Sequence, residues 1–352
     1  MRRSLHPAAW WIWGVLVGAA AVRITNPLLS VLLIVSIWVV VVARRRDVPW
    51  AHTYARFLRL GVAVIVIRLA LQALFTPDVP GHVLFELPEA DLPGWAAGVA
   101  VGGDVTAEGL LQALYEGLRL VGLLAALGAA NSLADPYRLL RAVPTALYEA
   151  GVAVTVALSL VPQSGVAVTQ VRDARRLRGR PTRGLAAVRG VAVPVLEGAL
   201  ERSVGMAASM DARGFGRRGD ADPLRARRAR WASALGLVAL AVGTYGLLDA
   251  GAPEGLGVPV LLAGSALLAI GLTRSGRQVH RTRYRPDPWR LPEWLTAMSG
   301  AVVLGGILLA GRAGLALSTP VYPLTVPTLA VVPALLVLVA ALPAVVTPEP
   351  QP

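Results

Sequence analysis

Two arginines in the middle of the chain stand directly before a glycine: Arg178 before Gly179, and Arg213 before Gly214. A glycine just past a helix supplies the left-handed conformation that ends it. An arginine in the last turn is favoured by the negative end of the helix dipole, by about 0.3–1 kcal/mol. Its planar guanidinium can donate two parallel hydrogen bonds to one carboxylate. The pattern therefore predicts two helix ends that each present an arginine to an acidic groove on a partner.

The composition leaves few other kinds of chemistry open. All 34 basic residues are arginine, because the chain contains no lysine. A P-loop needs its lysine at the phosphates, so no ATPase site of that class is expected here. There is no cysteine, and no HExxH, GxSxG or paired-carboxylate motif. The four histidines lie far apart: His6, His52, His82 and His280. We therefore expect no enzyme, no metal and no cofactor, and any ATP hydrolysis must come from separate subunits.

Two long helices are needed to place the arginines. One is predicted over residues 145–178 and the other over 185–213, with the helix-breaking link GRPTRG between them. The surrounding region, residues 162–230, holds 15 arginines and six acidic residues. It is too charged to cross a bilayer and too apolar to be a disordered tail. We therefore expect a cytoplasmic helical pair with an arginine–glycine end on each helix.

The second of these helices carries small and apolar residues at spacings of three and four, which place them on one helical face. After Val188 the stripe comprises Ala192, Val195, Ala199, Ser203, Met206 and Met210. Small residues allow another helix to approach closely. Packing between the two long helices is the simpler interpretation, and contact with another membrane protein is the alternative.

The rest of the chain has the composition of a membrane protein, since 55% of its residues are hydrophobic. Eight apolar segments are candidates for spans, and a ninth, at 146–161, is shorter. They cover residues 8–24, 27–43, 56–75, 107–130, 231–249, 256–273, 294–311 and 322–346. The first segment could be a cleaved signal peptide, but the apolar segment that follows at once favours an uncleaved span. The predicted class is an all-α, polytopic membrane protein.

The distribution of arginine predicts the orientation of these spans. Arginines are concentrated at residues 44–46, 162–230 and 274–290, whereas the loop at 76–105 has none and carries five acidic residues. By the positive-inside rule, the arginine-rich segments and both termini are cytoplasmic. The net charge of +13 has the same explanation, so nucleic acid is not an expected partner. The Ala-, Gly- and Arg-rich composition suggests a GC-rich coding genome, as in many bacteria. We therefore expect a bacterial cell membrane.

Arg68 and Arg119 fall inside predicted spans, where a charge is costly. They could mark a substrate path. We favour structural pairing with Glu116, Glu108 or a backbone carbonyl.

Taken with the arginine ends, several short segments resemble one family. They are LHP at 5–7, TNPLL at 25–29, GLRL at 117–120 and DPYRLLRAVP at 135–144. Over roughly residues 1–245 the chain is similar to the T component of energy-coupling factor (ECF) transporters. Ala212-Arg213-Gly214 matches the second coupling motif of that family, preceded here by Asp211. Leu177-Arg178-Gly179 stands in place of the first motif, with leucine where alanine is usual, so Arg175 or Arg176 could share its role.

The resemblance implies a coupling subunit of an ABC importer for vitamins, other micronutrients or metal ions. Two ABC ATPase subunits would dock on the arginine ends, and a separate membrane S component would bind substrate and could contact the small-residue stripe. It implies three parts: N-terminal membrane helices at 1–143, coupling helices at 144–230, and C-terminal membrane helices at 231–352. The last ~100 residues are an extension relative to the family.

Two other classes of transporter remain as alternatives. A self-contained secondary transporter would show inverted repeats and broken helices, and no convincing repeat relates the halves of this chain. A conventional ABC permease would carry one short coupling loop rather than two long helices.

Overall fold

The computed structural model describes residues 5–45, 53–75, 81–91, 100–142, 148–180, 184–215, 223–248, 253, 255–276, 287–322 and 324–348. Helices dominate, and the only strands in these ranges form one antiparallel pair, β1 (Val83–Asp91) with β2 (Ala100–Thr106). Contacts divide the chain into two units, Met1–Leu139 with Pro286–Pro352, and Leu140–Arg285. The three-part division expected from the sequence follows function rather than contacts, and it stays a prediction.

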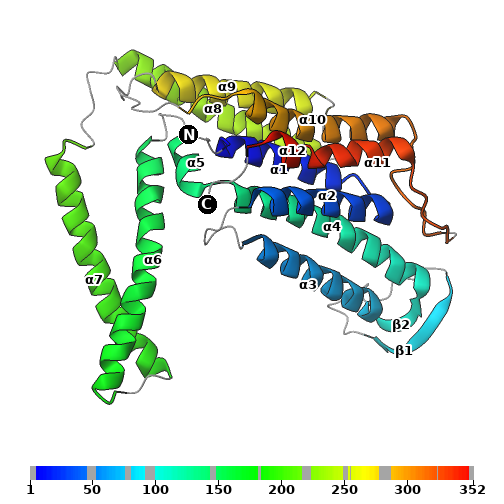
Figure 1. Ribbon diagram of the computed structural model, residues 1–352, viewed down its shortest axis with the longest axis horizontal. Coiled ribbons are helices and arrows are strands. Elements are labelled where there is room, and N and C mark those ends of the chain that lie inside the picture. The colour runs from blue at the N-terminus through cyan, green and yellow to red at the C-terminus, as the bar shows by residue number, and fades with distance from the viewer. Residues whose placement is uncertain are drawn as a thin grey trace. The chain divides into compact units, whose positions relative to one another are not determined.

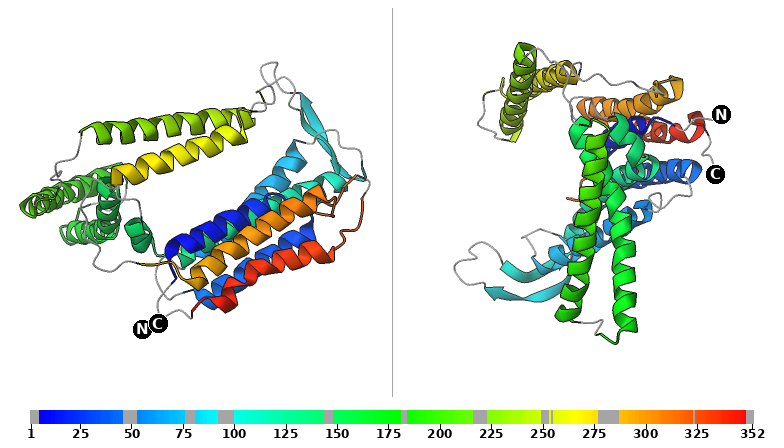
Figure 2. Two further views of the ribbon diagram at one scale, coloured as in Figure 1. Left: turned by 90° about the horizontal axis from the view of Figure 1, so that it is seen from above. Right: turned by 90° about the vertical axis from the view of Figure 1, so that its left-hand side faces the viewer.

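The first unit contains α1 (Pro7–Ala21), α2 (Pro27–Arg44), α3 (Thr53–Leu74), α4 (Ala107–Leu133), the start of α5 (Pro136–Ala142) and α10 (Leu291–Arg312). It ends with α11 (Val331–Leu338), the 3₁₀ turn η4 (Val339–Ala341) and α12 (Pro343–Val346). Helix α1 packs against both α4 and α10, and α2 packs against α4 and the α11–α12 segment. The left view of Figure 2 shows α10, from late in the chain, beside α1. The unit thus combines helices from the two ends of the chain.

Small residues bring α1 close to its two neighbours. A Cβ on Gly14 would lie 2.6 Å from the Cβ of Ala130 in α4, and one on Gly300 in α10 would lie 3.1 Å from the Cα of Trp13. Large aliphatic residues fill the space around these approaches: Val17, Leu29, Leu33, Ile37, Val303, Ile307 and Val337 are fully buried. Because core residues come from both ends of the chain, α10 to α12 are an integral part of this unit.

The second unit consists of two helical hairpins. One is formed by α6 (Tyr148–Leu177) and α7 (Leu185–Ala212), and the other by α8 (Pro223–Leu248) and α9 (Val258–Gly276). Figure 2 shows α8 and α9 side by side along their length. Gly236 of α8 faces the backbone of Leu268, and Gly264 of α9 faces that of Leu240, so the two backbones touch without an intervening side chain.

Six helices in the described residues are long and apolar enough to cross a membrane, which is compatible with a multi-pass membrane protein. They are Pro27–Arg44, Thr53–Leu74, Ala107–Leu133, Gly151–Leu177, Val258–Ser275 and Leu291–Arg312. Pro7–Ala21 and Val331–Val346 are shorter apolar helices. Most of α6 is in this set, although its sequence predicted a member of the cytoplasmic pair.

The last apolar segment, expected over 322–346, was predicted too long. Its helix begins only at Val331. Pro320 and Pro327 lie in the stretch before it, and proline both lacks a backbone donor and keeps the preceding residue out of the helical conformation. The strand pair β1–β2, in the loop expected to lie outside the cell, was not predicted at all.

Of the two arginines expected inside spans, Arg68 is paired as we favoured, whereas Arg119 makes no ion pair or hydrogen bond with the residues that the structure describes. Arg68 of α3 forms an ion pair with Glu116 of α4. Glu108 instead accepts hydrogen bonds from His82, at 2.8 Å from its backbone nitrogen and 2.8 Å from its Nδ1. Arg68 is therefore explained as a contact between neighbouring helices.

Candidate functional site

The two arginine–glycine segments end their helices with the same geometry. At the end of α6, the amide of Gly179 donates to the carbonyl of Arg176 at 3.1 Å, and that of Arg180 to Arg175 at 3.0 Å. Gly179 has a φ of 67°. These paired bonds across a left-handed glycine form a Schellman motif, in which the residue before the glycine is the C-cap.

The end of α7 repeats this arrangement. The amide of Gly214 donates to the carbonyl of Asp211 at 2.8 Å, and that of Phe215 to Met210 at 3.0 Å. Gly214 has a φ of 71°, and Arg213 occupies the C-cap position with its backbone. The predicted helix ends are thus confirmed, and both helices extend over almost the full predicted ranges.

Both arginines are available to a partner. The side chains of Arg178 and Arg213 are exposed, and neither makes a hydrogen bond or ion pair with the residues that the structure describes. The last carbonyls of each helix stay near them, so the dipole favours the positive charge at that place. Each guanidinium is therefore free to bind an external carboxylate.

The arginines at the end of α6 have different surroundings. Arg175 donates from its guanidinium to the carbonyl of Gly190 in α7 at 3.1 Å, and this guanidinium lies where a Cβ on Gly190 would be. Arg176 and Arg178 are exposed, and Leu177 is 89% exposed. Arg175 therefore joins the two helices, while Arg176 and Arg178 remain for a partner.

The structure does not bring the two arginine ends together. The chain turns back between α6 and α7, so the end of α6 lies beside the start of α7, and Arg213 lies at the opposite end of α7. Figure 1 shows this turn where the two helices meet. A helix of 28 residues is about 42 Å long. The two ends would therefore form two separate contact points rather than one site.

The predicted small-residue stripe of α7 is only partly covered. Val195, Ala199, Met206 and Met210 are half-buried, whereas Ala192 and Ser203 are exposed. Among the α7 residues whose burial the structure describes, Ala187 and Val191 are buried, and both lie near the turn. Packing against α6 is thus concentrated at the turn end of the hairpin.

A second stripe on α7 was not predicted from the sequence. Val193, Leu196, Leu200 and Val204 are between 57% and 69% exposed. Their spacing of three, four and four residues places them on one face. The same periodicity is visible in the sequence, but the prediction was based on the small residues of a neighbouring helical face.

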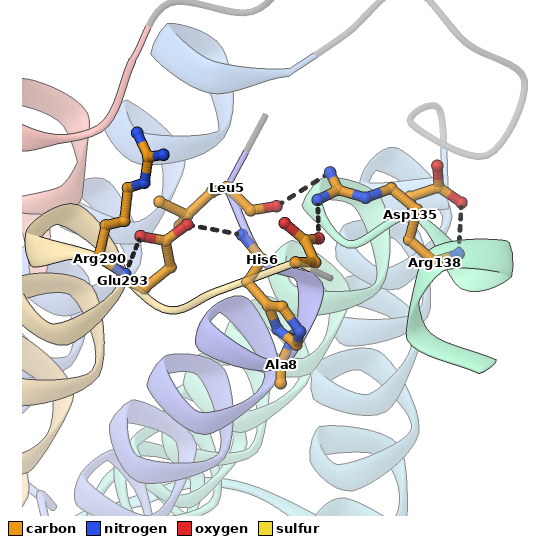
Figure 3. Close-up of polar contacts among 8 residues, drawn as sticks. Leu5, His6, Ala8, Asp135, Arg138, Arg290 and Glu293 are labelled. Carbon is orange, nitrogen blue, oxygen red and sulfur yellow. Dashed lines mark hydrogen bonds and ion pairs between the residues drawn. The ribbon is translucent and has the colours of Figure 1, made fainter. Parts of the chain in front are cut away.

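Three of the segments on which the resemblance rests have structural roles in the first unit, and Figure 3 shows the contacts of two of them, LHP and DPYR. Arg138, in the DPYR segment, donates to the backbone carbonyl of Leu5 at 3.2 Å and forms an ion pair with Asp287. The amide of His6 donates to Glu293 of α10 at 3.3 Å. Asn26, in the TNPLL segment, caps α2 at Leu28 and donates to the carbonyl of Thr328 at 2.8 Å.

These contacts join segments that are distant in the chain, and they were not anticipated from the sequence.

The described residues include no cluster of three or more histidine, aspartate or glutamate side chains that could hold a metal ion. No family model matches the chain, and no curated protein matches it significantly.

Proposed function

We propose that this chain is the transmembrane coupling subunit, or T component, of an ECF-type ABC importer in the bacterial cell membrane. It would link ATP hydrolysis by two separate ATPase subunits to the movement of a substrate-binding S component, for uptake of a vitamin, another micronutrient or a metal ion. The observation that carries the proposal is the repeated helix end: two consecutive helices stop at the same capped Arg-Gly step with an exposed guanidinium.

The separation of the two ends favours a partner with two binding sites. Arg178 and Arg213 can be up to about 42 Å apart, the length of α7. One small ligand cannot bridge that span, whereas a pair of ATPase subunits offers one groove to each end. The chain has no lysine for a P-loop, so in this proposal the ATP hydrolysis comes from such subunits.

The membrane arrangement in this proposal has eight spans and cytoplasmic termini, with α6 and α7 as coupling helices between the fourth and fifth spans. The apolar first part of α6 supports placing that part at the membrane, with the arginine-rich end in the cytoplasm. The stripe from Ala192 to Met210 and the exposed aliphatic stripe of α7 are the surfaces available to the S component.

The test is co-purification with the ATPase subunits encoded beside this chain. We expect Arg178→Glu with Arg213→Glu to weaken the complex by at least about 30-fold, because each change replaces an interface arginine by a repelling charge. ATP-driven uptake should fall in parallel.

The matched control is Arg172→Glu with Arg202→Glu, which makes the same charge change at exposed positions that precede Arg178 by six residues and Arg213 by eleven. Leu177→Ala, which restores the usual residue of the family motif, should leave binding intact. If ATPase binding and uptake survive the double change at the ends, the proposal is wrong. Substrate movement in vesicles that contain no ATPase would instead identify a secondary transporter.

A further inference from the structure

The start of α8 concentrates positive charge beside a cavity. A cavity of about 400 Å³ is lined by Arg227, Arg230, Trp231 and Ala234. The arginine side chains are exposed and make no hydrogen bond or ion pair with any described residue. The first turn of α8 holds no acidic residue. An anion in this cavity would therefore offset the charges of the two arginine side chains.

The cavity lies on the face of α8 that does not contact α9. The face toward α9 is marked by Ala229, Ser233, Gly236 and Gly243, which lie against the backbone or side chains of α9 or the residues just before it. At 100° per residue, Arg227, Arg230 and Ala234 are centred on the opposite side of the helix. The cavity is therefore open to a ligand that α9 does not displace.

An exposed apolar stripe continues from the cavity along the same helix. Trp231, Leu235, Val238, Val242 and Tyr245 follow one another at spacings of four and three, and each is 40–62% exposed. Trp231 and Tyr245 are about 21 Å apart along the helix axis. Arginines followed by a tryptophan and then by aliphatic residues have the order of polarity that leads from the headgroup region into the hydrocarbon core.

The hairpin as a whole fits that position. Helix α9 is long and apolar enough to cross a membrane, and α8 packs antiparallel against it, so Arg274 near the end of α9 lies at the same end as the arginines of α8. An arginine-rich end of this kind is cytoplasmic, and the cytoplasmic leaflet carries the anionic lipids.

We propose that this face binds an anionic phospholipid, with its phosphate between Arg227 and Arg230 and its acyl chains along the stripe from Trp231 to Tyr245. The volume of the cavity is in the range of small-ligand sites. Two guanidinium groups one turn apart can each donate to the oxygens of one phosphate. The inference concerns α8 alone and does not depend on the ATPase or S-component partners.

The test measures lipid binding to the purified full chain by native mass spectrometry, with phosphatidylglycerol and phosphatidylcholine as probes. We expect the wild-type chain to bind phosphatidylglycerol more tightly than phosphatidylcholine. Arg227→Gln with Arg230→Gln should lower the affinity for phosphatidylglycerol about tenfold or more and leave phosphatidylcholine binding unchanged. Both arginines are exposed, so the variant should fold, and far-UV circular dichroism checks this.

Two further variants identify the source of any loss. Arg202→Gln with Arg228→Gln removes the same charge outside the cavity and should retain binding. Arg227→Lys with Arg230→Lys keeps the charge and should restore most of it. Equal losses in the cavity variant and in the control, or no loss in either, would overturn the proposal. If inorganic phosphate competes as strongly as the lipid, the cavity is a free-anion site and the lipid assignment is wrong.

Discussion

The guanidinium groups of Arg178 and Arg213 owe their position to a backbone feature rather than to side-chain contacts. Each glycine that follows adopts a positive φ, and its amide closes the Schellman motif. The last carbonyls are thereby satisfied within the helix, so the arginine does not have to cap them. At the scale of single residues, glycine fixes the end of the helix and leaves the arginine side chain without a capping role.

A substitution at Gly214 tests this division of roles. Alanine in the left-handed conformation costs about 1–2 kcal/mol, so Gly214→Ala should speed hydrogen exchange of the amides at positions 214 and 215 by about 5- to 30-fold. Gly214→Asn should restore much of the protection, because asparagine tolerates that conformation. Equal protection in wild type and Gly214→Ala would show that the cap does not depend on the glycine.

At the scale of helices, glycines allow the backbones of α8 and α9 to pack directly against each other. A Cβ on Gly236 would lie 2.6 Å from the backbone nitrogen of Leu268, and one on Gly264 would lie 2.8 Å from that of Leu240. Real Cβ atoms do not approach so closely, so each glycine sets the distance between the helices. The face bearing Trp231 and Tyr245 is on the other side and takes no part in this packing.

The matched pair Gly236→Ala and Gly205→Ala separates packing from helix propensity. Gly236→Ala should destabilise the chain by about 1–3 kcal/mol because α8 and α9 must separate. A Cβ on Gly205 would have nothing within 4 Å, so Gly205→Ala should keep or raise stability, by up to about 1 kcal/mol. Thermal unfolding of the purified variants in detergent distinguishes them, and equal melting temperatures would contradict the close approach.

The helices themselves were largely predictable, because their signals are local. Apolar runs located α1 to α4 and α10, and a glycine after an arginine located the ends of α6 and α7. The start of α11 was misplaced because Pro320 and Pro327 interrupt an otherwise apolar run, and the strands β1 and β2 were missed because their loop carries no clear alternation. Both errors concern segments in which hydrophobicity is a poor guide to backbone conformation.

The candidate site was predictable only in part. Its residues and helix ends follow from local sequence, but the position of Arg213 at the far end of α7 depends on where the chain turns back. The use of Arg175 as a link to Gly190 could not be predicted, since it requires two segments to meet. The same holds for Arg138, which contacts Leu5 and Asp287 from distant parts of the chain.

At the scale of the whole molecule, the C-terminal extension is divided between the two units. Helix α9 pairs with α8, whereas α10 to α12 pack against α1 and α2. The residues after about 245 are therefore needed to complete both units, although the resemblance to T components ends near that point.

Splitting the chain tests this conclusion. Residues 1–285 expressed alone should be poorly stable and aggregate, because α1 loses the partner that buries Trp13. Co-expression of residues 286–352 as a separate chain should restore a monodisperse complex on size-exclusion chromatography. A control ending at residue 348 should behave like the full chain. If residues 1–285 alone are as stable as the full chain, α10 to α12 are not integral to the first unit.

The pairing of α1 with α10 also affects how the protein is made. A ribosome adds about 5–20 residues per second, so α10 emerges about 15 s to a minute after α1, once residues 22–290 have been translated. Until then the face of α1 that later meets Gly300 has no final partner. Complete burial of α1 is therefore a late step, which can come only after translation has reached the last fifth of the chain.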